Sequence, residues 1–442
     1  MAVVRCSPRC LGVATALVLV GLLALVAPAA SAAATPSQDP FYSYEGSAPL
    51  SSIAPGAVLK TRTLSYHVAG VPLPVTAVQL LYRSTGALGQ PTVNVTSVLR
   101  PLLQIGSPTV VSYQSFYDSL TNEGDPSYAI SGGVSFAGLI PDAESAVIAP
   151  ALLAGDTVVV PDTEGEEADL AAGPVYGMNT LDSLRAALAS PATGLAGASK
   201  IGLIGYSGGA IATEWAAELA PSYAPELSSR IVGAAFGGTL VDPAHNLRYV
   251  EGSTEWAGVI PIALIGIARA YQFNLTPYLS EYGLSLYEKL KNASITEVLG
   301  EYPGLTWSQL AKPQYPTPES IPVYDEVANR LIMGRSGTPT EPLFIGQGTG
   351  GELEGTPGDK PGIGPGDGVM IAGDVRSLAR EYCGRGVTVQ YRQYEGLSHI
   401  PAALEWLPEA YAWLEGRFLG RPAPQDCSEI APGNSLEPIP VP

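Results

Sequence analysis

Hydrophobic and polar positions along the chain follow two patterns, and each pattern predicts a different kind of element. Short runs of aliphatic and β-branched residues, bounded by Gly and Pro, are typical of strands. Such runs lie at residues 75–81, 92–99, 109–113, 157–160, 201–204, 230–236, 342–346 and 387–391. Stretches with helical spacing of apolar residues predict helices. These stretches lie at residues 178–188, 208–219, 259–270, 278–290, 371–382 and 402–416.

The order of these elements predicts the fold class. The first two strands, separated by Gly86 and Gly89, form a hairpin by their pattern. Strands that then alternate with helices predict a mostly parallel sheet covered on both faces, which is an α/β fold. Between residues 240 and 335 helical patterns with aromatic residues and prolines take over, where an α/β enzyme would insert a helical cap over its active site. The apolar stretch 259–270 could face lipid or an acyl chain, or form the core of the cap.

The first 32 residues have the pattern of a secretory signal peptide. Arg5 and Arg9 supply the positive region, residues 11–27 an apolar stretch, and Ala30-Ser31-Ala32 a cleavage site of small residues. We expect cleavage after Ala32 and an exported, extracellular protein. A membrane anchor is the rival interpretation, but an apolar stretch of about 17 residues is short for a span.

Composition narrows the class of protein further. Hydrophobic residues make up 46% of the 442 residues and charged residues 14%, which is typical of a globular protein with large buried surfaces. The formal net charge is −18 without a basic cluster, so nucleic acid is not an expected partner. Beyond the signal peptide only Cys383 and Cys427 remain, and in an oxidising compartment we expect them to form one disulfide. Two buried thiols are the alternative.

Residues 205–209, Gly-Tyr-Ser-Gly-Gly, match the nucleophile elbow G-x-S-x-G between a predicted strand and a predicted helix. Glycines two residues on either side of Ser207 let strand and helix approach without a Cβ clash. The helix N-terminus adds a partial positive charge and free N–H groups where an oxyanion would form. The sequence therefore predicts Ser207 as a nucleophile.

A serine nucleophile needs a general base, which is almost always a histidine, and the chain has three histidines. His399 follows the last strand and precedes the last helix, and this is the place of the base in the α/β-hydrolase order of nucleophile, acid and histidine. We interpret His245, which opens the cap region, as a histidine without a catalytic role. We interpret His67 as an ordinary surface residue.

Three aspartates in the right part of the chain could orient the base. We interpret Asp374, inside a helical pattern, as a solvated helix residue. Asp359 lies in a stretch rich in Gly and Pro that has little to fix it. Asp367 stands at the mouth of a helix with an apolar pair behind it, which would hold the carboxylate still, as an orienting acid requires.

No cofactor or metal is expected. Residues 346–351 match the dinucleotide fingerprint G-x-G-x-x-G after a strand, but Pro357, Pro361 and Pro365 prevent the helix that would hold the pyrophosphate. No zinc-ligand spacing occurs, and three scattered histidines cannot supply a typical site.

Further segments extend these motifs over nearly all of the mature chain. They are Gln-Leu-Leu-Tyr-Arg-Ser-Thr at 79–85, Ser-Tyr-Gln at 112–114, Tyr-Asp-Ser at 117–119 and Trp-Leu-Glu-Gly-Arg-Phe at 413–418. Cys383 lies sixteen positions after Asp367, and His399 lies sixteen positions after Cys383. Together with the elbow, this set resembles the secretory lipases of yeasts and actinobacteria, the group of Candida-type lipase A.

The resemblance implies an α/β-hydrolase fold with a mostly parallel central sheet and an inserted helical cap that forms an acyl-binding tunnel. It implies Ser207 as the nucleophile, Asp367 as the acid and His399 as the base, in agreement with the choice made from the residues. It also implies that backbone N–H groups of Asp118 and Gly208 form the oxyanion hole, and that the two cysteines of the mature chain are bridged.

We therefore expect a secreted serine hydrolase, a triacylglycerol lipase that acts on lipid esters at a lipid–water interface without a permanent membrane anchor. The alternatives are a carboxylesterase for short soluble esters, a peptidase of the same fold, and a catalytically inactive hydrolase fold that binds a ligand. The expected divisions are the signal peptide 1–32, the first part of the core 33–239, the cap 240–335, and the second part of the core with the C-terminal tail 336–442.

Overall fold

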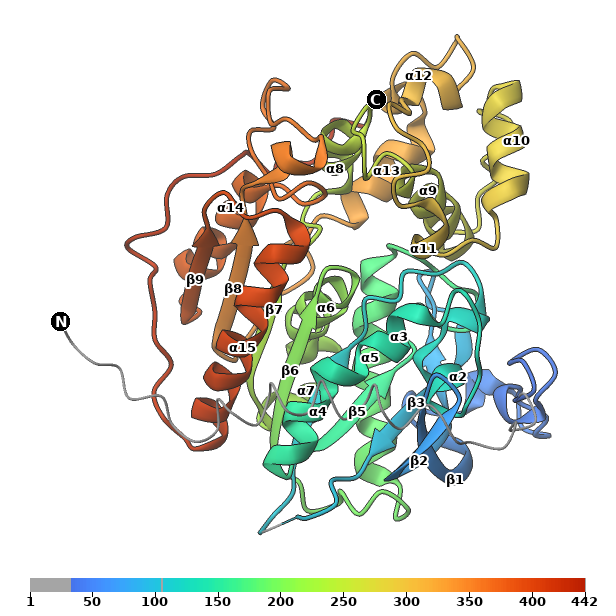
Figure 1. The fold of residues 1–442 in the computed structure, drawn as a ribbon, viewed down its shortest axis with the longest axis vertical. Helices are drawn as coiled ribbons and strands as arrows, with labels where there is room; N and C mark the ends of the chain where they lie inside the picture. The colour runs from blue at the N-terminus through green and yellow to red at the C-terminus, as the bar shows by residue number, and fades with distance from the viewer. Residues whose placement is uncertain (1–32, 105, 442) are drawn as a thin grey trace.

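The computed structural model describes residues 33–104 and 106–441 of the chain, so the expected signal peptide lies outside the described residues. The fold is built on a nine-stranded sheet with the order β1-β2-β3-β5-β4-β6-β7-β8-β9 (Figure 1). Its strands are β1 Val58–Val68, β2 Val71–Thr85, β3 Pro91–Leu99, β4 Thr109–Gln114, β5 Thr157–Pro161, β6 Lys200–Tyr206, β7 Ile231–Gly237, β8 Leu343–Gly348 and β9 Val389–Tyr394.

The sheet is parallel from β5 to β9 and antiparallel at the other end. Strands β5, β4, β6, β7, β8 and β9 pair in parallel. Strands β2 and β3 form the expected hairpin, and β3 joins the parallel part by pairing antiparallel with β5. The mostly parallel sheet predicted from the sequence is therefore confirmed, with the hairpin as its antiparallel extension.

Helices cover both faces of the sheet, which explains why its central strands are almost uniformly apolar. One face packs on α5 Gly173–Ala189, α6 Gly208–Tyr223 and α14 Ala372–Gly384. The other packs on α2 Pro126–Ile130, α4 Ser145–Ala154 and α15 His399–Phe418. On β6, Leu203 faces the first group and Ile204 the second, and both side chains are 0% exposed.

A group of helices lies between β7 and β8, in the stretch where the sequence predicts a cap. It comprises α8 Pro243–Val250, α9 Val259–Ala270, α10 Glu281–Leu290, α11 Ile295–Val298, α12 Trp307–Leu310 and α13 Pro322–Arg330. Figure 1 shows these helices gathered at one end of the sheet. They share an apolar cluster that includes Ile260, Leu286 and Val298, and Val369 from the loop after β8 joins it.

Several predicted boundaries differ from the observed ones. Helix α9 has the predicted bounds, but α10 begins at Glu281 and α5 begins at Gly173, where a proline in the first turn starts it. Helix α15 begins at His399, so this histidine is the first residue of the helix rather than a residue of the loop before it. The last strand, β9, runs to Tyr394, three residues beyond its predicted end.

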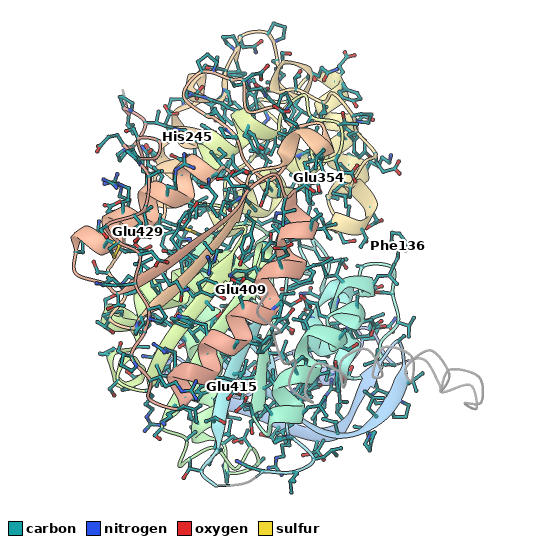
Figure 2. All side chains as sticks on the ribbon, turned by 60° about the vertical axis from the view of Figure 1, so that its left-hand side comes forward. Phe136, His245, Glu354, Glu409, Glu415 and Glu429 are labelled. Atoms are coloured by element: carbon teal, nitrogen blue, oxygen red, sulfur yellow. A yellow bond between two sulfur atoms is a disulfide. The ribbon has the colours of Figure 1, made fainter. Side chains whose placement is uncertain are left out.

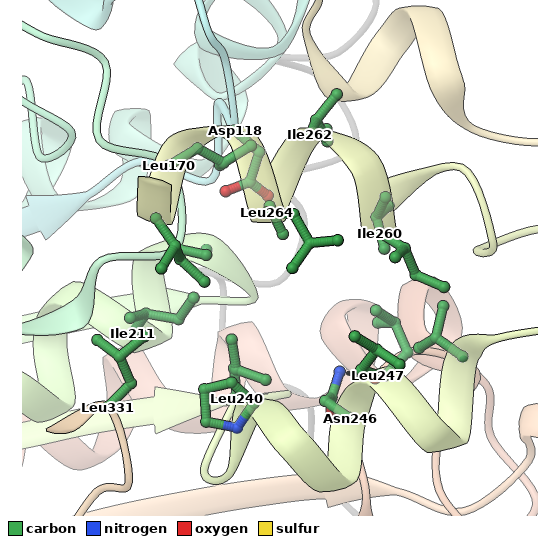
Figure 3. A pocket seen from close by; sticks show the side chains of 18 of the residues that line it. Asp118, Leu170, Ile211, Leu240, Asn246, Leu247, Ile260, Ile262, Leu264 and Leu331 are labelled. Atoms are coloured by element: carbon green, nitrogen blue, oxygen red, sulfur yellow. Dashed lines mark hydrogen bonds between the residues drawn. The ribbon is translucent and has the colours of Figure 1, made fainter. Parts of the chain in front are cut away.

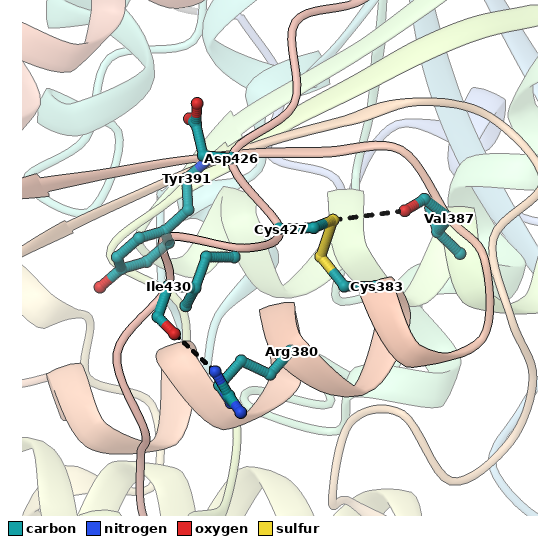
Figure 4. The surroundings of a disulfide bond; sticks show 7 residues. All are labelled: Arg380, Cys383, Val387, Tyr391, Asp426, Cys427 and Ile430. Carbon is teal, nitrogen blue, oxygen red and sulfur yellow. Dashed lines mark hydrogen bonds between the residues drawn. A yellow bond between two sulfur atoms is a disulfide. The ribbon is translucent and has the colours of Figure 1, made fainter.

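A disulfide fixes the C-terminal tail to the core. It joins Cys383, in the last turn of α14, to Cys427 beyond α15, with 5.7 Å between the two Cα atoms (Figure 4). The tail also contacts the helix by hydrogen bonds, since Arg380 Nη1 donates to the carbonyl of Ile430 at 2.6 Å. The tail therefore packs along α14, and this packing buries residues near the start of that helix.

Candidate active site

The turn between β6 and α6 holds Ser207 in a conformation that few residues adopt. Its φ and ψ are 55° and −123°, and its N–H donates to the carbonyl of Gly237 at 2.9 Å. A Cβ atom at Gly205 would overlap the carbonyl of Gly209, and a Cβ at Gly209 would overlap the carbonyl of Gln114. Space alone therefore requires glycine on both sides, as the elbow pattern predicts, and strain of this kind is typical of functional sites.

His399 and Asp367 form a buried pair. His399 Nδ1 lies 2.8 Å from Asp367 Oδ2, and the two residues are 4% and 0% exposed. The second carboxylate oxygen, Oδ1, accepts hydrogen bonds from the N–H groups of Val369 at 3.1 Å and Met370 at 2.8 Å. The His399 N–H in turn donates to the Asp367 carbonyl. The carboxylate is thus held from several sides, which an acid that orients a base requires.

Only one of the three eligible aspartates reaches His399. Asp359 is exposed. The interpretation of Asp374 as a solvated helix residue is wrong: its side chain is 2% exposed, and its carboxylate lies 3.2 Å from His245 Nδ1 and accepts a hydrogen bond from Asn434. The C-terminal tail covers this turn of α14, and the helical period of the sequence does not reveal that contact.

The remaining histidine lies outside the pair. His67, on β1, is half-buried, and its Nδ1 lies 3.2 Å from the carbonyl of Ile130. It is therefore more covered than an ordinary surface residue, because α2 packs against the strand that carries it.

Opposing effects set the pKa of His399. Burial alone would lower it, but the charge of Asp367 and its hydrogen bond raise it, with smaller contributions from Glu354 and Asp118, and the net shift is upward from 6.5. Because Nδ1 faces Asp367, a proton on this nitrogen leaves Nε2 as the basic atom. Nε2 is buried and has no hydrogen-bond partner among the described residues.

Ser207 and His399 both lie near the end of β7. Ser207 is bonded to Gly237, and a Cβ on the next residue, Gly238, would lie 2.8 Å from His399 Cε1. The ring of Tyr206, beside the serine, lies 5.0 Å from the imidazole ring, centroid to centroid. In the described part of the chain, however, the Ser207 hydroxyl makes no hydrogen bond to Nε2. His399 therefore lies near Ser207 without a hydrogen bond to it among the described residues.

The loop after β4 places Asp118 against the first residue of α6. The φ of Asp118 is 39°, and a Cβ at Gly208 would overlap its carboxyl. Both oxygens of Glu164 accept the N–H of Ser119 at 3.1 Å, which fixes the loop after β4 to the segment after β5. The carbonyl of Asp118 accepts the N–H of Ile295 at 2.8 Å, so the start of α11 also contacts it. Asp118 and Gly208, the expected oxyanion pair, thus lie side by side.

A cavity of about 140 Å³ opens on these residues. Ser207, Gly208 and Asp118 border it at one side, and most of the other lining side chains are apolar and come from α8, α9 and α13. Figure 3 shows the Asp118 carboxyl beside Leu170 and Leu264. Burial raises the pKa of Asp118 to about 7, against the opposing effect of His399.

Two neighbours of the base were not predicted from the sequence. Trp256, before α9, lies edge-on to His399 with 5.2 Å between ring centroids, and its Nε1 donates to Glu354 Oε2 at 2.6 Å. Figure 2 shows Glu354 at the cap end of the molecule, while Glu415 lies far down α15. Nothing in the sequence marks Trp256, Glu354 or Glu164, because each acts through contacts between segments that lie far apart in the chain.

Residues 33–104 and 106–441 lack two kinds of feature. These residues contain no group of three or more His, Cys, Asp or Glu side chains arranged to hold a metal ion. None of their helices combines the length and the apolar character that crossing a bilayer needs.

Comparison with known proteins places the chain in a family. A family model described as secretory lipase matches residues 132–359. The chain is 32% identical to a probable inactive lipase of Mycobacterium tuberculosis, over 88% of this chain and 83% of that protein. It is 30% identical to lipase 10 of Candida albicans, over 91% of this chain and 86% of that protein.

Solved structures agree with this assignment. Candida antarctica lipase A in its closed state has a TM-score of 0.77 and 25% identity, with 92% of this chain and 91% of that one covered. A rice cell wall degrading esterase of Xanthomonas oryzae shares the fold alone, with a TM-score of 0.60 at 14% identity over 84% of this chain and 100% of that one. The expected α/β-hydrolase fold is thereby confirmed, and the chain belongs to the secretory lipase family.

Proposed function

We propose that this protein is a secreted serine hydrolase that cleaves the carboxylic esters of lipids, acylglycerols first among them. The observation that carries the proposal is the buried pair of His399 and Asp367, which lies near the strained Ser207 and leaves Nε2 without a partner among the described residues. Membership of the secretory lipase family supports ester hydrolysis as the reaction class. The assignment of roles to the three residues is the proposal's own.

In the proposed reaction, His399 Nε2 takes the proton of Ser207 Oγ while this oxygen attacks the ester carbonyl carbon. The N–H groups of Asp118 and Gly208 donate to the oxyanion of the tetrahedral intermediate. The intermediate expels the alcohol, which leaves with the proton from His399. Water then adds to the acyl-enzyme with His399 as base again, and Ser207 recovers its proton as the fatty acid leaves.

The missing bond between Ser207 and His399 is compatible with this mechanism. Catalytic hydrogen bonds are often long in structures without substrate and tighten when substrate binds. A rotation of the serine side chain about its Cα–Cβ bond redirects Oγ while the elbow backbone stays fixed by Gly237. We therefore expect the bond to form once an ester occupies the cavity.

The lining of the cavity favours a substrate whose acid part is a lipid acyl chain. Its lining includes Ile260, Leu264 and Ile267 of α9 and Leu331 after α13, and it runs from Ser207 into the group of helices between β7 and β8. Apolar walls of this kind bind a hydrocarbon chain and offer no partners for peptide amides. This group of helices, residues 240–335, is in our proposal the cap of the enzyme. The signal-peptide pattern and the disulfide support export.

One observation favours a second candidate, a hydrolase fold without activity. The Mycobacterium tuberculosis relative, 32% identical, is named as probably inactive. If this chain shared that property, its cavity would bind a lipid without cleaving it. An esterase for short soluble esters is the other alternative, since it would use the same three residues.

Labelling by an alkyl fluorophosphonate separates these functions. We expect the wild type to be labelled and Ser207→Ala to remain unlabelled, with His399→Ala labelled far more slowly. Hydrolysis of p-nitrophenyl esters of graded chain length and of emulsified triglycerides then defines the substrate. An unlabelled wild type, or labelling that persists in Ser207→Ala, would overturn the proposed mechanism. Activity confined to short monomeric esters would favour the esterase.

A further inference from the structure

The Asp118 carboxyl is the feature of the cavity that the proposed reaction leaves unused. Its backbone N–H serves the oxyanion hole and its carbonyl accepts the N–H of Ile295. Its side chain borders the cavity beside Gly208, among apolar groups (Figure 3). No hydrogen bond or ion pair to this carboxyl exists in the described part of the chain. The residue is half-buried, and the cavity is where a substrate can reach this carboxyl.

The surroundings favour the neutral form of this acid. Burial penalises its charge and raises the pKa of Asp118 to about 7, and His399 is the neighbour that lowers it. The other titratable or charged groups around the loop are Glu164 after β5, Glu144 before α4, Tyr176 of α5 and Arg269 of α9. Burial also raises the pKa of Glu164 and Glu144.

We infer that the Asp118 side chain is a third donor of the oxyanion hole, whose carboxyl O–H donates a hydrogen bond to the oxyanion of the tetrahedral intermediate. The proton stays on Asp118 throughout, so the carboxyl forms and breaks no covalent bond in the reaction. A carboxylic acid kept neutral by an apolar site can act as such a donor. The inference rests on the proposed function, because it needs an oxyanion beside Ser207.

The geometry explains why the side chain can reach the oxyanion. The carboxyl lies so close to Gly208 that a Cβ there would overlap it, and Gly208 carries an N–H of the oxyanion hole directly after the nucleophile. The backbone of Asp118 is left-handed, and the residue borders the cavity together with Ser207 and Gly208. An ionised Asp118 would instead repel the developing negative charge.

This arrangement predicts a characteristic pH dependence. His399 must be neutral to act as a base, so kcat rises with pH through the pKa of His399. Asp118 must be protonated to act as a donor, so kcat falls again as pH rises through the pKa of Asp118. The alkaline decline therefore belongs to Asp118, and a donor that does not ionise should remove it.

Two substitutions test this with p-nitrophenyl esters between pH 5 and pH 9, with Ser207→Ala measured as the blank for spontaneous hydrolysis. Asp118→Asn keeps a donor at every pH, and Asp118→Gly removes the side chain; both residues tolerate a positive φ. We expect Asp118→Asn to keep substantial kcat and to lose the alkaline decline. We expect Asp118→Gly to lose about 10²-fold in kcat at pH 6 with little change in KM, the usual cost of one oxyanion donor.

The outcomes that contradict the inference are distinct. If Asp118 served only the backbone conformation, all three proteins would share one pH profile and one kcat, and the inference would fall while the proposed function stood. A wild type that hydrolyses no ester at any pH would overturn both. Should the glycine variant not fold, as judged by its melting curve, the comparison of Asp118→Asn with the wild type decides alone: an unchanged alkaline decline overturns the inference.

Discussion

This molecule contains two histidine–aspartate pairs, and in both of them the histidine Nδ1 contacts the aspartate carboxylate. His399 Nδ1 lies 2.8 Å from Asp367, and His245 Nδ1 lies 3.2 Å from Asp374. The histidine side chains are 5% and 20% exposed, and the aspartate side chains 0% and 2%. Figure 2 shows His245 at the end of the molecule where the helices between β7 and β8 lie. Both pairs are largely buried, but only the first lies near Ser207, the proposed nucleophile.

The two pairs differ in the contacts of the atoms outside the histidine–aspartate contact, which are the other imidazole nitrogen and the other carboxylate oxygen. In the first pair, backbone N–H groups hold the spare carboxylate oxygen, while His399 Nε2 has no partner in the described part of the chain. In the second pair, Asn434 of the C-terminal tail bonds to Asp374, and Asp242 also lies 3.8 Å from the histidine. The second pair therefore joins α8, α14 and the tail. A histidine–aspartate contact becomes catalytic only where a third group can exchange a proton.

The largest expected effect is on kcat, and it distinguishes the two pairs. Asp367→Asn should lower kcat by about 10⁴-fold, because the amide favours the wrong tautomer of His399 and removes the charge that stabilises its protonated form. The matched change in the other pair, Asp374→Asn, should leave kcat near the wild-type value. Steady-state kinetics on a p-nitrophenyl ester measures both. A crippled Asp374→Asn with an active Asp367→Asn would reverse our assignment.

Next in size is the loss of the disulfide, which anchors the same helix that carries Asp374. Replacing Cys383 and Cys427 by serine should lower the free energy of unfolding by roughly 2 to 4 kcal/mol, because the open chain gains conformational freedom when it unfolds. The first pair should be unaffected, so kcat stays the same at temperatures where the variant is folded. Chemical denaturation gives the free energy, and an unchanged midpoint would contradict the expectation.

A smaller effect should appear in the stability of Asp374→Asn. The amide cannot keep the charge-assisted contact with His245 or accept as strongly from Asn434, so we expect a loss of about 1 to 3 kcal/mol. Asp359→Asn is the control, since that residue is exposed and should show no change. Equal melting temperatures for the two variants would show that the second pair carries no stability.

The smallest expected effect is a pH dependence of the stability that His245 and Asp374 contribute. The hydrogen bond of Asp374 raises the pKa of His245 above its usual value, against the opposing effect of burial. A histidine whose pKa is raised on folding stabilises fully below its unfolded pKa of about 6.5 and loses that contribution as pH rises through the folded value. His245→Gln should therefore destabilise more at pH 5 than at pH 8.5, by less than about 1 kcal/mol. A gap of the opposite sign in unfolding curves would refute this.

Local sequence patterns predicted the parts of the fold whose causes are local. The elbow was predictable because glycine is the only residue that fits beside the carbonyls of Gly209 and Gln114, and α9 because its apolar spacing runs unbroken. Helix α4 and strand β1 were not predicted. The first is apolar on nearly every side and shows no helical period, and the second is an edge strand with one face towards solvent.

The candidate site likewise contains residues that local patterns predict and residues whose environment depends on distant segments. Spacing and chain order singled out Ser207 and His399, and the local apolar residues after Asp367 singled out the acid. The burial of Asp374 could not be predicted, because Asn434, sixty residues further on in the chain, provides it. Glu164 and Trp256 act on the site through tertiary contacts for the same reason.

A hydrogen bond from Leu120 to the carbonyl of Ala293 and a second one from Ile295 to the carbonyl of Asp118 join the loop after β4 to the start of α11. Any motion that lifts α11 away must release this carbonyl, and the loop that bears Asp118 then relaxes with it. In our proposal, the position of α11 therefore affects the oxyanion hole. An enzyme engineer who exchanges residues 240–335 for the helices of another lipase has to provide an equivalent N–H at this point, or the graft will alter turnover as well as chain-length preference.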